Sequence, residues 1–151
     1  MPHLYFAYGS NMRSARLRER VPAARSLGRA RLAGFRLAWN KPGRDGSGKA
    51  NIVLARTEVV WGVLYEFPPG AWAALDSIEL DYTRETHDVR GPDGELAAAQ
   101  LYRWHCEPDL ADRAPHDWYQ DHLVAGAREH HLPAEVIKAL SRARERILAE
   151  E

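Results

Sequence analysis

Apolar and polar residues alternate along much of this chain, and the spacing predicts strands through its middle and helices at its end. The expected strands cover residues 3–7, 26–40, 51–55, 59–67, 82–89 and 96–106. The expected helices cover residues 12–20, 71–78, 116–131 and 133–148. Strands that dominate the middle of a chain, with helices closing it, are typical of the α+β class.

Two of the expected strands differ in how they should be buried. One alternates apolar and polar residues, with Leu32, Phe35, Leu37 and Trp39 as its expected core contacts. The other, residues 59–67, is nearly continuous in apolar residues. A run of that kind predicts a strand that is covered on both faces.

Segments rich in glycine and proline separate these elements. Residues 41–49 form a polar loop with glycine and lysine, but their spacing matches no phosphate-binding motif. Gly91-Pro92-Asp93-Gly94 predicts a turn between two strands, and residues 107–115 predict a loop. Neither a repeat nor a linker divides the 151 residues, so one domain, residues 1–151, is expected.

The first expected strand ends at a short loop, Tyr8-Gly9-Ser10-Asn11, which has features of a binding site. Gly9 permits backbone angles that a side chain would forbid. Ser10 and Asn11 are both good N-cap residues for the helix expected from Met12. The N–H groups at such a corner can bind anionic or carbonyl oxygens. The same stretch also fits an ordinary capped turn at the surface.

This loop differs from three other motifs that contain glycine. No Gly-Lys-Ser/Thr follows it, which excludes a Walker loop, and Gly9 stands alone, which excludes a dinucleotide fingerprint. Asn11-Met12 replaces the second glycine of a nucleophile elbow. Ser10 would act as a nucleophile only with a histidine or lysine partner, and the sequence identifies none.

The composition is that of an ordinary soluble globule, 45% hydrophobic and 28% charged. Cys106 is the single cysteine, so no disulfide can form within the chain, which suits a reducing compartment. The sequence has neither a secretory signal nor an apolar run of membrane-spanning length. We therefore expect a cytoplasmic protein with no membrane partner.

The net charge is zero, but its distribution is uneven. Residues 1–50 hold eleven Lys/Arg and two Asp/Glu, so this third of the chain is strongly basic. The arginines are scattered over helix, loop and strand rather than forming the stripe expected of a nucleic-acid interface. We expect no nucleic-acid partner, and a basic rim that could attract a substrate carrying a carboxylate.

Histidines and carboxylates are the candidates for metal binding and for acid–base chemistry in this sequence. The seven histidines have no metal-ligand spacing and are expected at the surface, and His105 and Cys106 should point to opposite faces of a strand. The carboxylates Asp76, Glu79, Asp81 and Glu85 cluster around the exit of a short helix. Asp76 and Glu79 should share a helical face, and a glutamate at a helix C-terminus is disfavoured by the dipole. The cluster is either a solvated helix end or a functional site.

Three separated motifs resemble those of the γ-glutamylcyclotransferase family. They are Tyr8-Gly9-Ser10-Asn11, Trp61-Gly62-Val63 and Leu75-Asp76-Ser77-Ile78-Glu79. Further residues follow in the order and at about the spacing of that family: Pro115, Tyr119, Gly126-Ala127 and Leu132-Pro133. The resemblance covers nearly the whole chain, and the pairing of the first motif with the third is fairly specific.

The resemblance implies a small mixed β-barrel with helices packed outside it and a cavity at its mouth. Members of that family convert a γ-glutamyl amide, such as a γ-glutamyl-amino acid, into 5-oxoproline and a free amine, without metal or organic cofactor. By its place in the motif Glu79 is the expected general acid and base, and residues 8–11 are expected to hold the glutamyl group. Tyr82 and Tyr119 are expected in the substrate-binding wall or, equally, in the core. The resemblance also implies a homodimer.

Two positions depart from the usual pattern and leave the departing amine open. Leu80 stands where many members have glycine, and Tyr82-Thr83-Arg84 lies closer to the glutamate than usual. One alternative is a γ-glutamylamine cyclotransferase or a biosynthetic member that removes a γ-glutamyl group. Another is a non-catalytic module that uses the same cavity to bind a small carboxylate or a partner protein.

Overall fold

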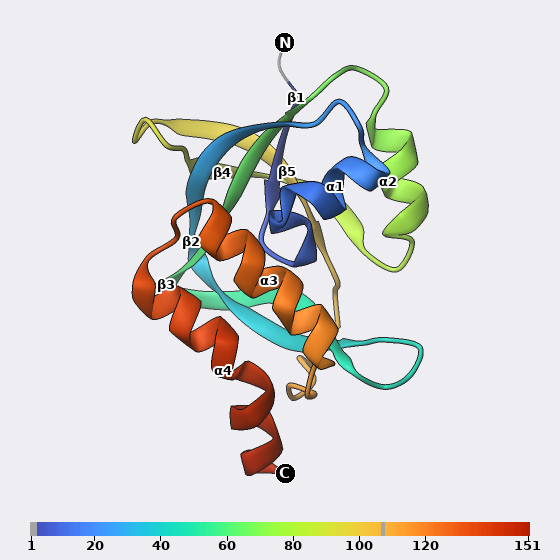
Figure 1. Ribbon diagram of the computed structural model, residues 1–151, viewed down its shortest axis with the longest axis vertical. Helices are drawn as coiled ribbons and strands as arrows, with labels where there is room; N and C mark the ends of the chain where they lie inside the picture. The colour runs from blue at the N-terminus through green and yellow to red at the C-terminus, as the bar shows by residue number, and fades with distance from the viewer. Residues whose placement is uncertain (1–2, 107) are drawn as a thin grey trace.

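The computed structural model describes residues 3–106 and 108–151 (Figure 1). Its strands are β1 His3–Ala7, β2 Arg25–Pro42, β3 Gly48–Phe67, β4 Thr83–Arg90 and β5 Leu96–Arg103. Its helices are the 3₁₀ turn η1 Ser10–Met12, α1 Ser14–Arg20, α2 Trp72–Ile78, α3 Asp117–Glu129 and α4 Ala134–Glu150. Residue 107, where the expected loop 107–115 begins, lies outside the described residues.

The strands close into a barrel in the order β1-β3-β2-β4-β5. β1 pairs antiparallel with β3 and parallel with β5, so the sheet is mixed and its two edges meet at β1. Closure satisfies the N–H and C=O groups that an open edge would leave without partners. The helices lie outside this barrel (Figure 1). The α+β class and the mixed barrel with external helices are therefore confirmed.

The long hairpin of β2 and β3 forms most of the barrel wall. Residues 51–55 and 59–67, expected as two strands, belong to the single strand β3, so that expectation was wrong. The register shifts where Ala33 pairs with Val59 but Phe35 pairs with Leu54. The intervening polar residues thus form a bulge, which bends a strand without ending it.

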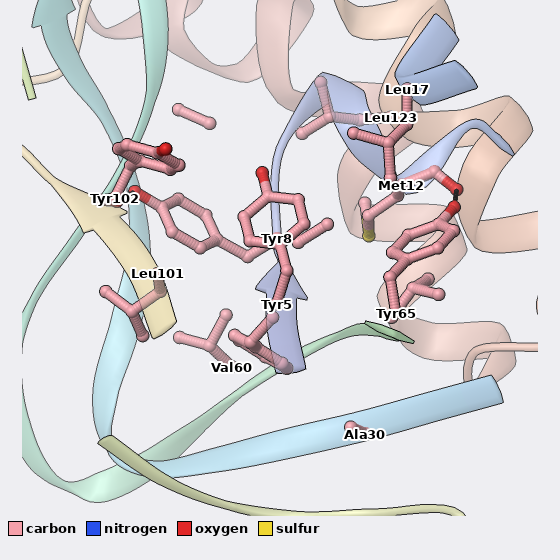
Figure 2. Packing of buried hydrophobic residues seen from close by; sticks show 14 of the residues in the cluster. Tyr5, Tyr8, Met12, Leu17, Ala30, Val60, Tyr65, Leu101, Tyr102 and Leu123 are labelled. Atoms are coloured by element: carbon pink, nitrogen blue, oxygen red, sulfur yellow. Dashed lines mark hydrogen bonds between the residues drawn. The ribbon is translucent and has the colours of Figure 1, made fainter. Parts of the chain in front are cut away.

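The barrel interior is filled by aromatic and aliphatic side chains from every strand. On β1, Phe6 is fully buried and Tyr5 packs against Phe67, Trp72 and Tyr102 with ring centroids 5.2 to 6.0 Å apart. Figure 2 shows Tyr5 and Tyr8 beside β1, among core residues from β3 and β5. Because β1 is packed on both sides, the loop that follows it starts from a rigid position.

The predicted core positions of β2 are also buried. Leu32, Phe35 and Trp39 are each less than 10% exposed, and Leu37 is partly buried against the same cluster. In α2, Trp72 and Leu75 are buried, whereas Ile78 at the end of the helix is 46% exposed. The buried apolar face of α2 therefore ends before the helix does.

Helices α3 and α4 pack against each other, and α3 also contacts η1. Their inner faces carry buried apolar residues at helical spacing, Leu123 and Ala127 on α3 and Leu140 and Ile147 on α4. This arrangement places α3 directly behind the first loop. Across the described parts of the chain, every helix is too short or too polar to span a membrane.

Candidate functional site

A cavity of about 210 Å³ lies where three segments far apart in the sequence meet. The loop after β1 contributes residues 8–11, the end of α2 and the turn after it contribute residues 78–82, and the start of β3 contributes Lys49 and Ala50. Side chains from α1, α3 and β5 complete the wall. This cavity contains every residue that the sequence predicted for the site: Glu79, Tyr8, Gly9, Ser10, Asn11, Tyr82 and Tyr119.

Five of the chain's six tyrosines line the cavity: Tyr5, Tyr8, Tyr82, Tyr102 and Tyr119. Burial raises the pKa of each hydroxyl, and raises that of Tyr119 to about 12. The hydroxyls therefore stay neutral at physiological pH, and each can donate one hydrogen bond and accept others. The cavity wall is thus polar without carrying negative charge from tyrosine.

The loop after β1 forms a 3₁₀ turn rather than a capped helix start. The Met12 N–H donates to the Gly9 carbonyl at 3.0 Å, and the α-helix begins only at Ser14, with Arg13 in the N-cap position. Ser10 and Asn11 therefore make no side-chain cap, and that expectation was wrong. Their side chains serve other contacts, and among the described residues no acceptor takes the N–H groups of Gly9, Ser10 and Asn11.

Side chains fix this loop from both ends. The buried Asn11 amide donates to the Tyr5 hydroxyl at 3.0 Å, and the Ser10 hydroxyl accepts from Arg16 Nε at 3.0 Å. Tyr65 donates its hydroxyl hydrogen to the Met12 carbonyl at 3.0 Å, and Figure 2 shows this contact as a dashed line. A loop tied in this way keeps its N–H groups in one arrangement, which binding of a small molecule requires.

Two glycines allow the segments of this region to approach one another closely. A Cβ on Gly9 would lie 3.2 Å from the Ala50 Cβ, so Gly9 lets the loop sit against β3. A Cβ on Gly126 of α3 would lie 2.5 Å from the carbonyl carbon of Met12. The family resemblance had singled out Gly126, and the physical reason is this approach of α3 to the loop.

Glu79 stands at the C-terminal end of α2, where its N–H donates to the Leu75 carbonyl at 2.9 Å. The next turn closes when Tyr82 N–H donates to the Glu79 carbonyl at 3.0 Å, after which β4 begins. Leu75 is fully buried, and the Asp76 carboxylate accepts a 2.6 Å hydrogen bond from the Tyr102 hydroxyl. These contacts attach α2 to the barrel and set the direction in which Glu79 leaves it.

The Glu79 carboxyl is 19% exposed and lies 3.3 Å from Arg20 Nη1. The same Arg20 nitrogen donates to the Asn11 side-chain oxygen at 3.2 Å, so Arg20 links the glutamate to the first loop. Burial raises the pKa of Glu79 above its ordinary value, although Arg20, Arg16 and Lys41 oppose that rise. The result is a carboxyl that accepts a proton more readily than a solvated glutamate.

Tyr82 and Tyr119 both hold the backbone of Ala50. Tyr82 donates its hydroxyl hydrogen to the Ala50 carbonyl at 2.8 Å, and the Tyr119 hydroxyl accepts from the Ala50 N–H at 2.9 Å. Both rings line the cavity while their hydroxyls fix its floor on β3. Tyr82 and Tyr119 therefore line the cavity and also have a structural role, so the two alternatives expected from the sequence do not exclude each other.

Four cationic side chains in the cavity were missed by the sequence analysis: Arg16, Arg20, Lys41 and Lys49. Arg16 and Arg20 are four residues apart on α1, so they share one helical face beside the loop. That spacing was visible in the sequence. Lys41 lies near the end of β2 and Lys49 at the start of β3, although the sequence placed both in a polar loop of residues 41–49, and they come together because β2 pairs with β3.

The other carboxylates of the predicted cluster have different surroundings. Asp76 pairs with Arg84 at 3.0 Å, and Glu85 accepts hydrogen bonds from His87 and His105 at 2.8 Å each. Neither lines the cavity, whereas Asp81 does and pairs there with Lys41 at 3.0 Å. Within the described ranges, no group of three or more His, Cys, Asp or Glu side chains is arranged to hold a metal ion.

Two expectations about histidines need correction. His105 and Cys106 lie beyond the end of β5, so they do not occupy opposite faces of a strand. His130 was expected at the surface, but its side chain is only 8% exposed. Its Nε2 lies 3.0 Å from the Ser14 hydroxyl, because α3 packs against the start of α1.

The sequence and the fold of this chain are both similar to those of known proteins. A family model described as "Gamma-glutamyl cyclotransferase, AIG2-like" matches residues 5–121. The Bos taurus protein named gamma-glutamylcyclotransferase is 29% identical over 152 residues, 91% of this chain and 77% of that one. The Homo sapiens protein of that name is 29% identical over 141 residues, 87% of this chain and 73% of that one. A solved structure described as a gamma-glutamyl cyclotransferase has a TM-score of 0.84 at 27% identity, and the match covers 93% of this chain and 86% of that one.

Proposed function

The chain belongs to the gamma-glutamyl cyclotransferase, AIG2-like family, and we propose that it converts a γ-glutamyl-amino acid into 5-oxoproline and a free amino acid. The proposed reaction is an intramolecular cyclisation that uses no cofactor. The observation that carries the proposal is the shared cavity, which is lined both by the carboxyl of Glu79 and by the loop of residues 8–11. The named relatives support an enzyme of this family.

Ring closure requires a base. The substrate's α-amine attacks its own γ-carbonyl carbon, so a new C–N bond forms as the bond to the leaving amine breaks. The α-amine arrives as an ammonium ion and loses one proton to the Glu79 carboxylate before it attacks, and the ring nitrogen loses a second proton as the lactam forms. The protonated carboxyl donates the first proton to the departing nitrogen and then passes the second to the released amine, so the amine leaves as an ammonium ion and the Glu79 carboxylate is regenerated. Partial burial, which raises the pKa of Glu79, suits it to both steps.

The carbonyl oxygen develops negative charge as the ring closes. The N–H groups of Gly9, Ser10 and Asn11 are free of protein acceptors among the described residues and would donate to this oxygen or to the glutamyl carboxylate. Removing one oxyanion donor typically raises a barrier by about 3–4 kcal/mol. The tyrosine hydroxyls of the wall would hold the rest of the glutamyl chain. Two of them, those of Tyr82 and Tyr119, are themselves fixed by hydrogen bonds to the backbone of Ala50.

The proposed function is tested by incubating the purified protein with γ-glutamylalanine and quantifying products by mass spectrometry. The proposal expects 5-oxoproline and alanine in equal amounts. Formation of glutamate and alanine would instead indicate hydrolysis, and an unchanged substrate would indicate a binding protein. Either of these two outcomes would contradict the proposal.

Substituting Arg20 is expected to change the pH dependence of the reaction. Arg20 lowers the pKa of Glu79, so Arg20→Met should raise that pKa. The base is active when ionised, so activity falls as pH drops through its pKa, and the acid limb of kcat/KM should move to higher pH in the variant. The measurement is a kcat/KM profile with γ-glutamylalanine.

The matched control for this profile is Arg18→Met, on the same helix but outside the cavity lining. Its acid limb should coincide with that of the wild type. An Arg20→Met acid limb that stays in place or moves to lower pH would contradict the assignment of Glu79 as the titrating base.

The homodimer and the cytoplasmic location expected from the sequence stay predictions.

A further inference from the structure

The charges that line the cavity are not balanced within the protein. Arg20 pairs with Glu79 at 3.3 Å and Lys41 pairs with Asp81 at 3.0 Å. Considering residues 3–106 and 108–151, no carboxylate lies within ion-pair distance of the other two cations, Arg16 and Lys49. Partly buried charges are normally paired, so two uncompensated cations in one cavity indicate an anionic ligand.

Lys49 is held in place without an ion pair. Its ammonium lies 4.3 Å from the ring centroid of Tyr119 and 4.6 Å from that of Trp118. Partial burial lowers its pKa, which means that its surroundings leave the charge incompletely solvated. Asp45 favours that charge from a distance, but its oxygens are engaged by Ser47 and His116. A carboxylate in the cavity would supply the missing partner.

The wall that presents Lys49 is rigid. The adjacent residue, Ala50, has both backbone groups fixed by the hydroxyls of Tyr82 and Tyr119. Lys49 is therefore carried on a strand whose position is set from two directions. A cation on such a support can recognise one ligand group at a defined place rather than attract anions in general.

Arg16 and Lys49 contact different parts of the cavity wall. Arg16 donates to the Ser10 hydroxyl, so it belongs to the loop proposed to hold the glutamyl end of the substrate. Lys49 belongs instead to the wall formed by Ala50 and Tyr119. A γ-glutamyl-amino acid carries two carboxylates, one on each side of the amide bond, whereas a γ-glutamylamine carries only that of the glutamyl end. Two uncompensated cations match the first substrate class.

We propose that Lys49 binds the carboxylate of the departing amino acid and thereby makes the enzyme prefer γ-glutamyl-amino acids to γ-glutamylamines. This inference rests on the proposed cyclisation. It assigns Lys49 as a specificity-determining residue, with Arg16 facing the glutamyl carboxylate. Lys49 takes no part in the proton transfers at Glu79.

Two substrates test this role because they differ only in the carboxylate. γ-Glutamylalanine releases alanine, and γ-glutamylethylamide releases ethylamine, which is alanine without its carboxyl group. A charge-assisted hydrogen bond to the carboxylate should give the wild type a preference of at least about 10-fold in kcat/KM for γ-glutamylalanine. The rate of 5-oxoproline formation is measured for both substrates under the same conditions.

Three variants separate a specific contact from a general effect of charge. Lys49→Met, which removes the charge but keeps most of the length of the side chain, should reduce the preference to within about threefold of unity, mainly by raising KM for γ-glutamylalanine. Lys49→Arg should restore part of it. Lys41→Met is the matched control, since Lys41 lines the same cavity but is already paired with Asp81, and it should keep most of the preference.

The outcomes distinguish this inference from the function on which it rests. If the wild type forms 5-oxoproline equally well from both substrates, or faster from the ethylamide, the cyclisation stands and the role of Lys49 is overturned. The role is also overturned if Lys41→Met abolishes the preference as completely as Lys49→Met. If the wild type forms 5-oxoproline from neither substrate, the proposed function and this inference both fall.

Discussion

Replacing Glu79 with glutamine is expected to lower kcat for 5-oxoproline formation by about 10²- to 10⁴-fold, the range that proton transfer by a positioned side chain contributes. Glutamine keeps the size of the side chain and one acceptor oxygen, but it cannot accept the ammonium proton. Substrate binding should change much less than kcat, because the loop of residues 8–11 is untouched. Steady-state kinetics with γ-glutamylalanine measures the first effect, and calorimetric titration of the variant measures the second.

The folded state of the Glu79→Gln variant should be as stable as the wild type at neutral pH, or more stable. Burial raises the pKa of Glu79 above its ordinary value of 4.5, so the folded protein binds this proton more tightly than the unfolded chain. The stabilisation is fully present below the ordinary value and is lost as pH rises through the raised pKa. At pH 7 the ionised carboxyl therefore weakens the fold, a common property of catalytic groups.

The matched control for this variant is Glu85→Gln, because Glu85 is also a partly buried glutamate but lies outside the cavity lining. It should change kcat by no more than a few fold. A Glu79→Gln variant with nearly wild-type kcat, or a Glu85→Gln variant with an equal loss, would show that the proton is carried by another group.

The second large effect is expected from Gly126→Ala on α3. Alanine in place of a helical glycine usually stabilises a helix by about 1 kcal/mol. Here the added Cβ would lie 2.5 Å from the Met12 carbonyl carbon and 2.6 Å from the Arg13 nitrogen. Both contacts are with backbone, which cannot move aside without shifting η1. We therefore expect the free energy of unfolding to fall by about 1–3 kcal/mol, the usual range for overpacking.

The sign of the Gly126→Ala effect makes it informative. Urea denaturation measures the stability, and kcat/KM for γ-glutamylalanine should also fall because the displaced turn carries Ser10 and Asn11. Arg128→Ala, at an exposed position of the same helix, should change stability by less than about 0.5 kcal/mol. A gain in stability for Gly126→Ala would mean that α3 and the loop are not in tight contact.

Much of the fold was predictable because its strands have clear apolar patterns. β1 was assigned with its observed bounds, and the core positions Leu32, Phe35 and Trp39 followed from simple alternation. The bulge in β3 was missed, because Arg56, Thr57 and Glu58 look like a polar break. Their strand continues because β2 supplies pairing on both sides of them, which is a long-range effect that local sequence does not record.

The site was predictable only as separate motifs. The resemblance to the family indicated Glu79 and the loop of residues 8–11, but not the ion pair between Glu79 and Arg20 or the uncompensated Lys49. These depend on how α1, α2 and β3 meet around the barrel. Ser10 and Asn11 were misjudged as helix caps because cap preference is a local rule. In the folded chain Arg16 and Tyr5 are their hydrogen-bond partners instead.

The most direct test is a crystal structure of the Glu79→Gln variant soaked with γ-glutamylalanine. We expect the glutamyl γ-carbonyl oxygen within hydrogen-bond distance of an N–H group of residues 9–11. We also expect the α-amine beside the side chain of residue 79. A substrate bound outside this cavity, or bound within it with its α-amine turned away from residue 79, would contradict the account.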